Sequence, residues 1–155
     1  MTNRIELISG ADPENTFVYV NNKLISVAEL IVMGNVATRV DASGCTNLTT
    51  LDLPAATWVD ARGCTGLTTL DLPAATTVDA SGCTGLTSYI YGGTDIRGYC
   101  FVSLILRNER RVLAGYRNFS IPEARQHWEN NVECLAFVEK IAAEAARSGE
   151  NVATP

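Results

Sequence analysis

The stretch that decides the fold is a near-literal duplication in the middle of the chain. Residues 40–58 read VDASGCTNLTTLDLPAATW, and residues 59–77 read VDARGCTGLTTLDLPAATT. The two 19-residue units match at 16 positions, and residues 78–88 (VDASGCTGLTS) begin a third unit. Residues 30–39 (LIVMGNVATR) fit the same register as a degenerate half unit. A fixed period of this kind is typical of repeat architectures, so the sequence predicts stacked copies of one small unit.

Each unit contains two short strand-like segments. In the first, Leu51 and Leu53 fall on one face of a strand, and the proline that follows ends the segment. In the second, Val59 is expected to face inward, while Trp58 and Asp60 face outward. One unit cannot bury its leucines alone, so each strand is expected to pair in parallel with its copy in the next unit.

Stacking in this register places identical residues in columns. The expected inward columns are Leu51/Leu70, Leu53/Leu72, Val40/Val59/Val78 and Cys45/Cys64/Cys83. The expected outward columns are Thr50/Thr69/Ser88, Asp52/Asp71 and Asp41/Asp60/Asp79. Residues 40–88 carry five Asp and one Arg, so the columns predict a strongly acidic surface. That surface either binds a basic partner or cation, or serves only to keep the protein in solution.

These units resemble the leucine-rich repeat family. Cys45–Pro54 and Cys64–Pro73 follow the order Cys-x-x-Leu-x-x-Leu-x-Leu-Pro, which is similar to short bacterial and phage variants. The resemblance covers residues 40–88 and, loosely, 30–39, and it implies a protein that binds a partner, usually another protein. A unit of 19 residues leaves no room for the outer helix of longer repeats. The C-terminal stretch AGYRNFSIPEARQHW (114–128) is similar to uncharacterised phage proteins.

The segments on either side of the repeats are expected to cap the exposed ends of the stack. The strand-like segments 17–20 and 23–27 flank Asn21-Asn22, and because Asn tolerates a positive φ, the sequence predicts a tight hairpin there. Downstream, residues 97–106 and 111–116 predict a second hairpin.

Two helices are expected after the second hairpin. Ser120 and Glu123 have the spacing of a capping box, which predicts a helix to about residue 128. Residues 132–147 place apolar side chains on one face and predict a second helix. The sequence therefore predicts an α+β chain built as a short two-sheet parallel β-solenoid with a hairpin cap and a hairpin-plus-two-helix cap. Its expected parts are an N-terminal cap (1–29), a solenoid (30–91), a C-terminal cap (92–149) and a flexible tail (150–155).

Composition excludes several classes of function. The chain has 155 residues and a formal net charge of −5, so the clustered Lys and Arg of a nucleic-acid-binding protein are missing. No apolar run approaches the roughly 20 residues of a membrane span, and the first residues lack the pattern of a secretory signal. A cytoplasmic protein with five reduced cysteines and no membrane partner is expected.

The single histidine, His127, is the candidate general base for a catalytic function. His127 lies near Cys134 and Glu123 in the sequence, but no nucleophile-elbow or other catalytic motif surrounds them. The alternative is that His127 and Trp128 pack the short helix that contains them onto the hairpin. The equal spacing of Cys45, Cys64 and Cys83 follows the repeat and lacks the close pairing of zinc ligands, so no metal and no cofactor are expected.

Binding is expected on the repeats. Trp58 shares a column with Arg39 and Thr77, so it is either an exposed hot spot or a side chain covered by a cap. The predicted binding residues are Thr50, Asp52, Trp58, Asp60, Thr69, Asp71 and Asp79. The preferred hypothesis is a non-catalytic module that binds a protein partner, such as a phage-type inhibitor of a host protein.

Two other hypotheses stay open. One is a self-assembling structural protein that forms homo-oligomers, and the other is an enzyme that uses His127. Four arginines near the second hairpin, namely Arg107, Arg110, Arg111 and Arg117, form either a solvated turn or a contact with another copy's acidic surface.

Overall fold

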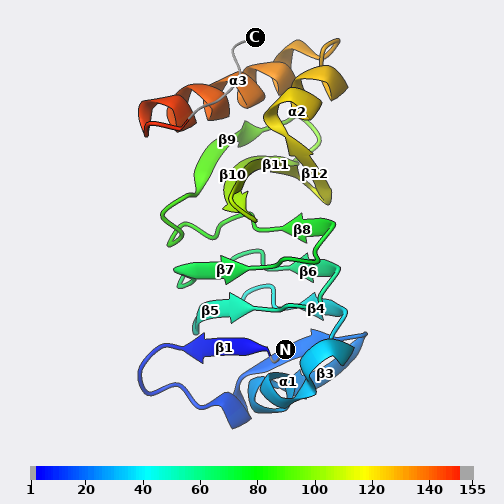
Figure 1. Ribbon diagram of the computed structural model, residues 1–155, viewed down its shortest axis with the longest axis vertical. Coiled ribbons are helices and arrows are strands. Elements are labelled where there is room, and N and C mark those ends of the chain that lie inside the picture. The colour runs from blue at the N-terminus through cyan, green and yellow to red at the C-terminus, as the bar shows by residue number, and fades with distance from the viewer. Residues whose placement is uncertain (1–2, 151–155) are drawn as a thin grey trace. The chain divides into compact units, whose positions relative to one another are not determined.

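The chain forms two compact units, which we call unit 1 (Met1–Thr87) and unit 2 (Ser88–Pro155). The computed structural model describes residues 3–150 (Figure 1). Residues 151–155, most of the predicted flexible tail, lie outside the described residues.

Unit 1 contains two mixed sheets. Its strands are β1 (Arg4–Leu7), β2 (Phe17–Val20), β3 (Lys23–Ser26), β4 (Arg39–Asp41), β5 (Leu48–Asp52), β6 (Trp58–Asp60), β7 (Thr69–Asp71) and β8 (Thr77–Asp79). One sheet has the order β1-β5-β7, and the other has the order β3-β2-β4-β6-β8. Helix α1 (Val27–Met33) and the 3-10 helices η1 (Pro13–Asn15) and η2 (Gly34–Val36) complete the unit.

The repeats stack in the register that their sequence predicts. Strands β4, β6 and β8 pair in parallel, with Val40 opposite Val59 and Val59 opposite Val78. Strands β5 and β7 pair in the same way, with Leu51 opposite Leu70. Backbone and threonine hydroxyl groups also bond to carbonyls 19 positions earlier, as in Thr68 Oγ1 to Thr49 O.

The predicted architecture, a two-sheet parallel β-solenoid, is nevertheless wrong. The protein is a mixed α+β structure with three sheets, and several of its strand pairs are antiparallel. Strand β1 joins β5 and strand β2 joins β4, both antiparallel. The repeats supply only five short strands, so their open edges are completed by strands of opposite direction, and unit 2 forms a sheet of its own.

Most of residues 30–39 is helical and not a half repeat, and only Thr38 and Arg39 at its end follow the repeat register. Helix α1 covers Val27–Met33, and its N-terminus is capped by the Ser26 hydroxyl, which accepts from the Glu29 N–H. The helix ends at Gly34, whose φ is +61°. Apolar residues at both 27 and 30 are buried on one helical face, and this spacing suits a helix better than a strand.

The inward columns of the repeats form the core of unit 1. Val40, Val59 and Val78 are fully buried, and Leu51 is buried while its copy Leu70 is half-buried. Sulfur atoms tie successive repeats together: Cys64 Sγ donates to Ala42 O at 3.1 Å, and Cys83 Sγ donates to Ala61 O at 3.0 Å. Burial raises the pKa of both thiols to about 12, so they stay protonated donors at neutral pH.

Unit 2 packs two helices on an antiparallel sheet of order β12-β11-β10-β9 (Figure 1). Its elements are β9 (Ile90–Thr94), β10 (Cys100–Leu106), β11 (Glu109–Ala114), β12 (Arg117–Ser120), α2 (Ile121–His127) and α3 (Val132–Arg147). The β10/β11 hairpin, both helices and the Ser120–Glu123 capping box are found as predicted, whereas β9 and β12 were not predicted. The core includes Phe101, Trp128 and Ile141.

The four arginines near this hairpin do not form one solvated cluster. Arg107 is exposed in the β10/β11 turn, but the Arg110 side chain is buried. Arg110 pairs with Glu150, the first residue of the predicted tail, and also donates to Ser103 Oγ. Arg111 bonds to the side chain and carbonyl of Asn118.

Stacking explains why the first repeat has Asn47 where the second repeat has Gly66. At Gly66, an added Cβ would lie 2.7 Å from Thr46 O and 3.0 Å from Leu48 O, both in the preceding repeat. Gly85 faces the equivalent oxygens of Thr65 and Leu67 at similarly short distances. In the first repeat, which has no repeat before it, Asn47 occupies the position equivalent to Gly66 and Gly85. Glycine is therefore required only where one turn lies directly on another.

This steric account predicts different costs for reciprocal substitutions. Gly66→Asn should lower the free energy of unfolding by about 1–3 kcal/mol, because a backbone oxygen must move to admit the Cβ. Asn47→Gly should cost no more than about 1 kcal/mol, since it removes no backbone contact and adds only chain entropy. Urea denaturation followed by circular dichroism measures both. Equal costs for the two variants would contradict the account.

Candidate functional site

The structure separates the seven predicted binding residues into two groups. Thr50, Asp60 and Asp79 are buried, with 5%, 1% and 7% of their surface exposed. The prediction that these three side chains are exposed is therefore wrong. The others remain accessible: Thr69 and Asp71 are exposed, and Asp52 and Trp58 are half-buried.

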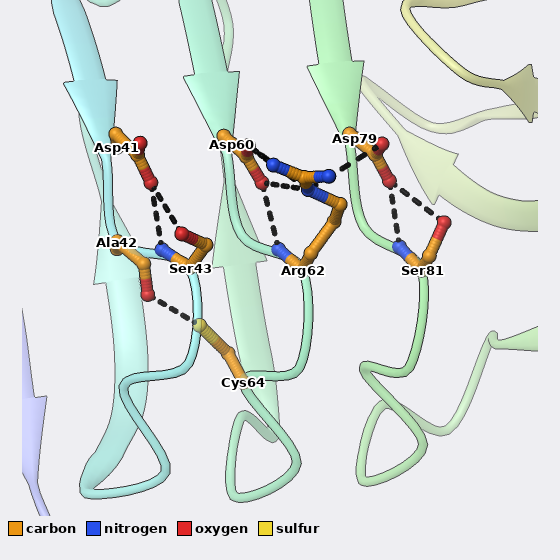
Figure 2. A network of polar contacts seen from close by, with 8 residues as sticks. All are labelled: Asp41, Ala42, Ser43, Asp60, Arg62, Cys64, Asp79 and Ser81. Carbon is orange, nitrogen blue, oxygen red and sulfur yellow. Dashed lines mark hydrogen bonds and ion pairs between the residues drawn. The ribbon is translucent and has the colours of Figure 1, made fainter.

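Asp60 and Asp79 are buried because each folds back onto the turn that follows its strand (Figure 2). Asp60 Oδ1 accepts from the Arg62 N–H, and Asp79 Oδ1 accepts from the Ser81 N–H and hydroxyl. Asp41, in the first repeat, holds Ser43 in the same way. Aspartate commonly makes this bond to a backbone N–H two residues on.

Arg62 offsets the repulsion between two of these carboxylates. Its guanidinium lies 2.7 Å from Asp60 Oδ2 and 3.9 Å from Asp79 Oδ2 (Figure 2). The equivalent positions hold Ser43 and Ser81. The column Asp41/Asp60/Asp79 is thus a structural feature of the turns, and Arg62 compensates part of the charge of Asp60 and Asp79.

Replacing aspartates from the two columns should have different effects on stability. Asp60→Ala removes the acceptor of buried turn bonds and should lower the free energy of unfolding by about 1–3 kcal/mol. Asp71→Ala should change it by no more than about 0.5 kcal/mol, because the side chain is exposed. Thermal and urea unfolding provide the comparison. Equal destabilisation by both substitutions would show that the Asp60 turn is not structural.

The exposed acidic residues lie on the sheet β1-β5-β7. Asp52 and Asp71 are register partners, and we call them, together with Thr69, the acidic column. Partial burial and the charge of Asp71 raise the pKa of Asp52, while Arg4 lowers it. Thr50 is covered because Glu6 lies opposite it on β1 and accepts from its hydroxyl at 3.4 Å.

The other sheet of unit 1 exposes large apolar side chains on its outer face. Strand β2 alternates, so Val18 and Val20 are 2% exposed while Phe17 and Tyr19 are each 50% exposed. Next to them, Leu24 is paired with Tyr19 and is 52% exposed. We call the surface formed by Phe17, Tyr19, Leu24, Arg39 and Trp58 the aromatic face.

Trp58 is neither fully exposed nor covered by a cap. Arg39 lies opposite it on β4, and the Arg39 Cζ is 3.6 Å from the centroid of the Trp58 ring. This is a close cation–π contact that fixes the guanidinium over the indole. The two residues, with Tyr19, Asn22 and Asp41, line a pocket of about 310 Å³, which we call the Arg39 pocket.

The turn between β9 and β10 in unit 2 also exposes an apolar side chain. Ile96 is 93% exposed, and its two neighbours, Asp95 and Arg97, are hydrogen-bonded to each other. Asp95 is buried and accepts from the N–H groups of Arg97 and Tyr99 and from the Arg97 guanidinium. The sequence Asp95-Ile-Arg97-Gly repeats the pattern of Asp60-Ala-Arg62-Gly.

The groups considered for catalysis are engaged in packing and capping. The His127 ring contacts Phe119, with centroids 4.8 Å apart, and Cys134 is buried, which raises the pKa of its thiol. Hydrogen bonds with Ser120 lower the pKa of Glu123. Within residues 3–150 no hydrogen bond joins His127 to Cys134 or Glu123. In the same part of the chain, no three His, Cys, Asp or Glu side chains are placed to hold a metal ion.

Comparisons with family models, with curated proteins and with solved structures found no match. The resemblance to leucine-rich repeats therefore stays a prediction. Of the helices in the described chain, none combines the length and the apolar character needed to cross a lipid bilayer.

The sequence interpretation missed most of the aromatic face. It found Trp58 as an exception within the repeat, but it assigned Phe17 and Tyr19 to a cap without asking which side chains face outward. The alternation FVYV indicates this, since either Phe17 and Tyr19 or Val18 and Val20 must point to solvent. Arg39 could be placed beside Trp58 from the repeat register alone.

Proposed function

We propose that the chain is a non-catalytic protein-interaction module and that its partner binds the aromatic face. The observation that carries the proposal is the half-exposure of Phe17, Tyr19 and Leu24 on one sheet face. Hydrophobic side chains exposed singly need no explanation, but an adjacent group beside Trp58 and Arg39 is typical of a binding surface.

The residue types support a protein partner. Trp, Tyr and Arg are the residues most enriched among energetic hot spots of protein interfaces. Trp58 and Arg39 are already held against each other, and the strands beneath them are fixed by the repeat register. A rigid aromatic surface loses little conformational entropy when a partner binds.

The acidic column is the less favoured binding surface. It offers charge without apolar area, and the pKa of Asp52 is raised first by partial burial and then by repulsion from Asp71. An exposed charge at the rim of an interface mainly affects the association rate. The acidic column therefore provides a matched control for the aromatic face.

The proposal predicts which substitutions abolish capture of a partner. Tyr19→Ala/Trp58→Ala removes two aromatic anchors, and Asp52→Asn/Asp71→Asn removes the exposed charges from the other sheet. In affinity capture from cell lysate with quantitative mass spectrometry, the aromatic variant should lose at least about 10-fold of the specific partner, which corresponds to about 1.4 kcal/mol. The acidic variant should retain it. Circular dichroism verifies that both variants fold.

The opposite pattern of capture would place the binding surface on the acidic column and would contradict the proposal. Self-assembly is the competing function, and sedimentation velocity distinguishes it. A mass that rises with protein concentration and falls in Tyr19→Ala/Trp58→Ala would show that the aromatic face binds another copy of the chain.

A further inference from the structure

The Arg39 pocket contains polar groups whose hydrogen-bonding capacity is unused. Among residues 3–150, the Tyr19 hydroxyl, the Asn22 amide and the Arg39 guanidinium form no hydrogen bond with another protein group. Asp41 accepts from Ser43 through Oδ1 only, which leaves Oδ2 open. By contrast, the side chain of Asn21, which precedes Asn22 in the same turn, bonds to Val36 O and to the Arg39 N–H.

Arg39 differs from most arginines of the protein. In the described part of the chain, six others pair with a carboxylate: Arg4, Arg62, Arg97, Arg110, Arg111 and Arg125. Arg39 has a carboxylate two residues away, at Asp41, yet it makes no ion pair with it and instead lies over the Trp58 ring. Arg62 and Asp60, two residues apart in the next repeat, do form such a pair.

Stacking on Trp58 prepares the guanidinium for one type of ligand. The Arg39 Cζ lies 3.6 Å from the centroid of the Trp58 ring, so the indole covers the guanidinium from one side. An arginine presents its N–H donors in one plane, as a rigid fork. A carboxylate accepts two such parallel donors in a bidentate pair. Because the stack fixes the guanidinium before binding, less conformational entropy is lost when the pair forms.

The neighbouring Asp41 favours an acidic amino-acid residue over phosphate as the ligand. Asp41 Oδ2 can accept a further hydrogen bond, and its charge repels a ligand that carries negative charge on all sides, such as phosphate. An amino-acid residue with an acidic side chain meets both demands, since its carboxylate can take the Arg39 donors while its backbone N–H bonds to Asp41.

We propose that the Arg39 pocket binds an aspartate or glutamate side chain of the protein partner. This inference rests on the proposed function and names the partner's anchoring group. The acidic residue would lie at the centre of an otherwise apolar contact, where Tyr19 and Trp58 exclude water from the ion pair and so strengthen it.

The pocket can be tested without the partner, by nuclear magnetic resonance of the full chain. The probes are N-acetylglutamate N-methylamide, its neutral glutamine counterpart and inorganic phosphate, each titrated at constant ionic strength. The glutamate probe should shift the Trp58 indole and Arg39 Nε resonances and saturate, with a dissociation constant on the order of 1 mM. The buried Trp128 indole serves as the internal control and should not shift.

Substitutions define the role of the guanidinium. Arg39→Ala should abolish the glutamate-induced shift, and Arg39→Lys, which keeps the charge but not the planar fork, should weaken binding at least about 5-fold. Arg147→Ala removes an exposed arginine outside the pocket and should leave the titration unchanged. The retained Trp128 resonance and unaltered chemical-shift dispersion verify that each variant folds.

Three outcomes would overturn the inference: equal shifts with the glutamine probe, preferential binding of phosphate, or glutamate binding that persists in Arg39→Ala. Its failure is distinguishable from failure of the proposed function. If Tyr19→Ala/Trp58→Ala loses the partner while the glutamate probe does not bind, the aromatic face is an interface without an acidic anchor.

Discussion

Backbone pairing between residues 19 positions apart is the constraint on which unit 1 depends. Each repeat has strands of only three to five residues, too short to be stable alone, and parallel pairing places identical side chains above one another. The Val and Cys columns become a continuous core, and the thiols of Cys64 and Cys83 bond to carbonyls of the preceding repeat. A substitution that disturbs one repeat is therefore felt by its neighbours.

Pairing between residues 19 positions apart also explains the three positions at which the first two repeats differ. Asn47 stands where Gly66 is required by close backbone approach, and Arg62 stands beside two stacked carboxylates. Trp58 provides a surface on which Arg39 can lie. Two differences thus stabilise the stack, and the third creates the pocket to which we assign binding. In a stack of near-identical repeats, a residue that differs from its copies, such as Trp58, can form a binding site while the other repeat positions maintain the fold.

Sequence reasoning predicted the parts that depend on local periodicity and failed where distant segments complete a sheet. The repeat register, the Asn21-Asn22 hairpin and the helix begun by Ser120 follow from neighbouring residues. The antiparallel addition of β1 to β5 does not, since no local pattern specifies which strand covers an open edge. Asp60 was predicted to be exposed from strand alternation, but its carboxylate turns back to accept from the N–H of Arg62, two residues on, and is buried by this local bond.

Deletion of one repeat tests the central role of the 19-residue register most directly. Removing residues 59–77 joins Trp58 to Val78 and restores the repeat sequence, so the variant should unfold cooperatively, at lower denaturant concentration, and keep the Arg39 contact with Trp58. Removing residues 59–76 leaves one extra residue at the start of the joined strand, so either that residue bulges out or the strand side chains move to the opposite face. This variant should therefore unfold at a clearly lower denaturant concentration than the 19-residue deletion. Equal behaviour of the two deletions in urea denaturation would contradict the account.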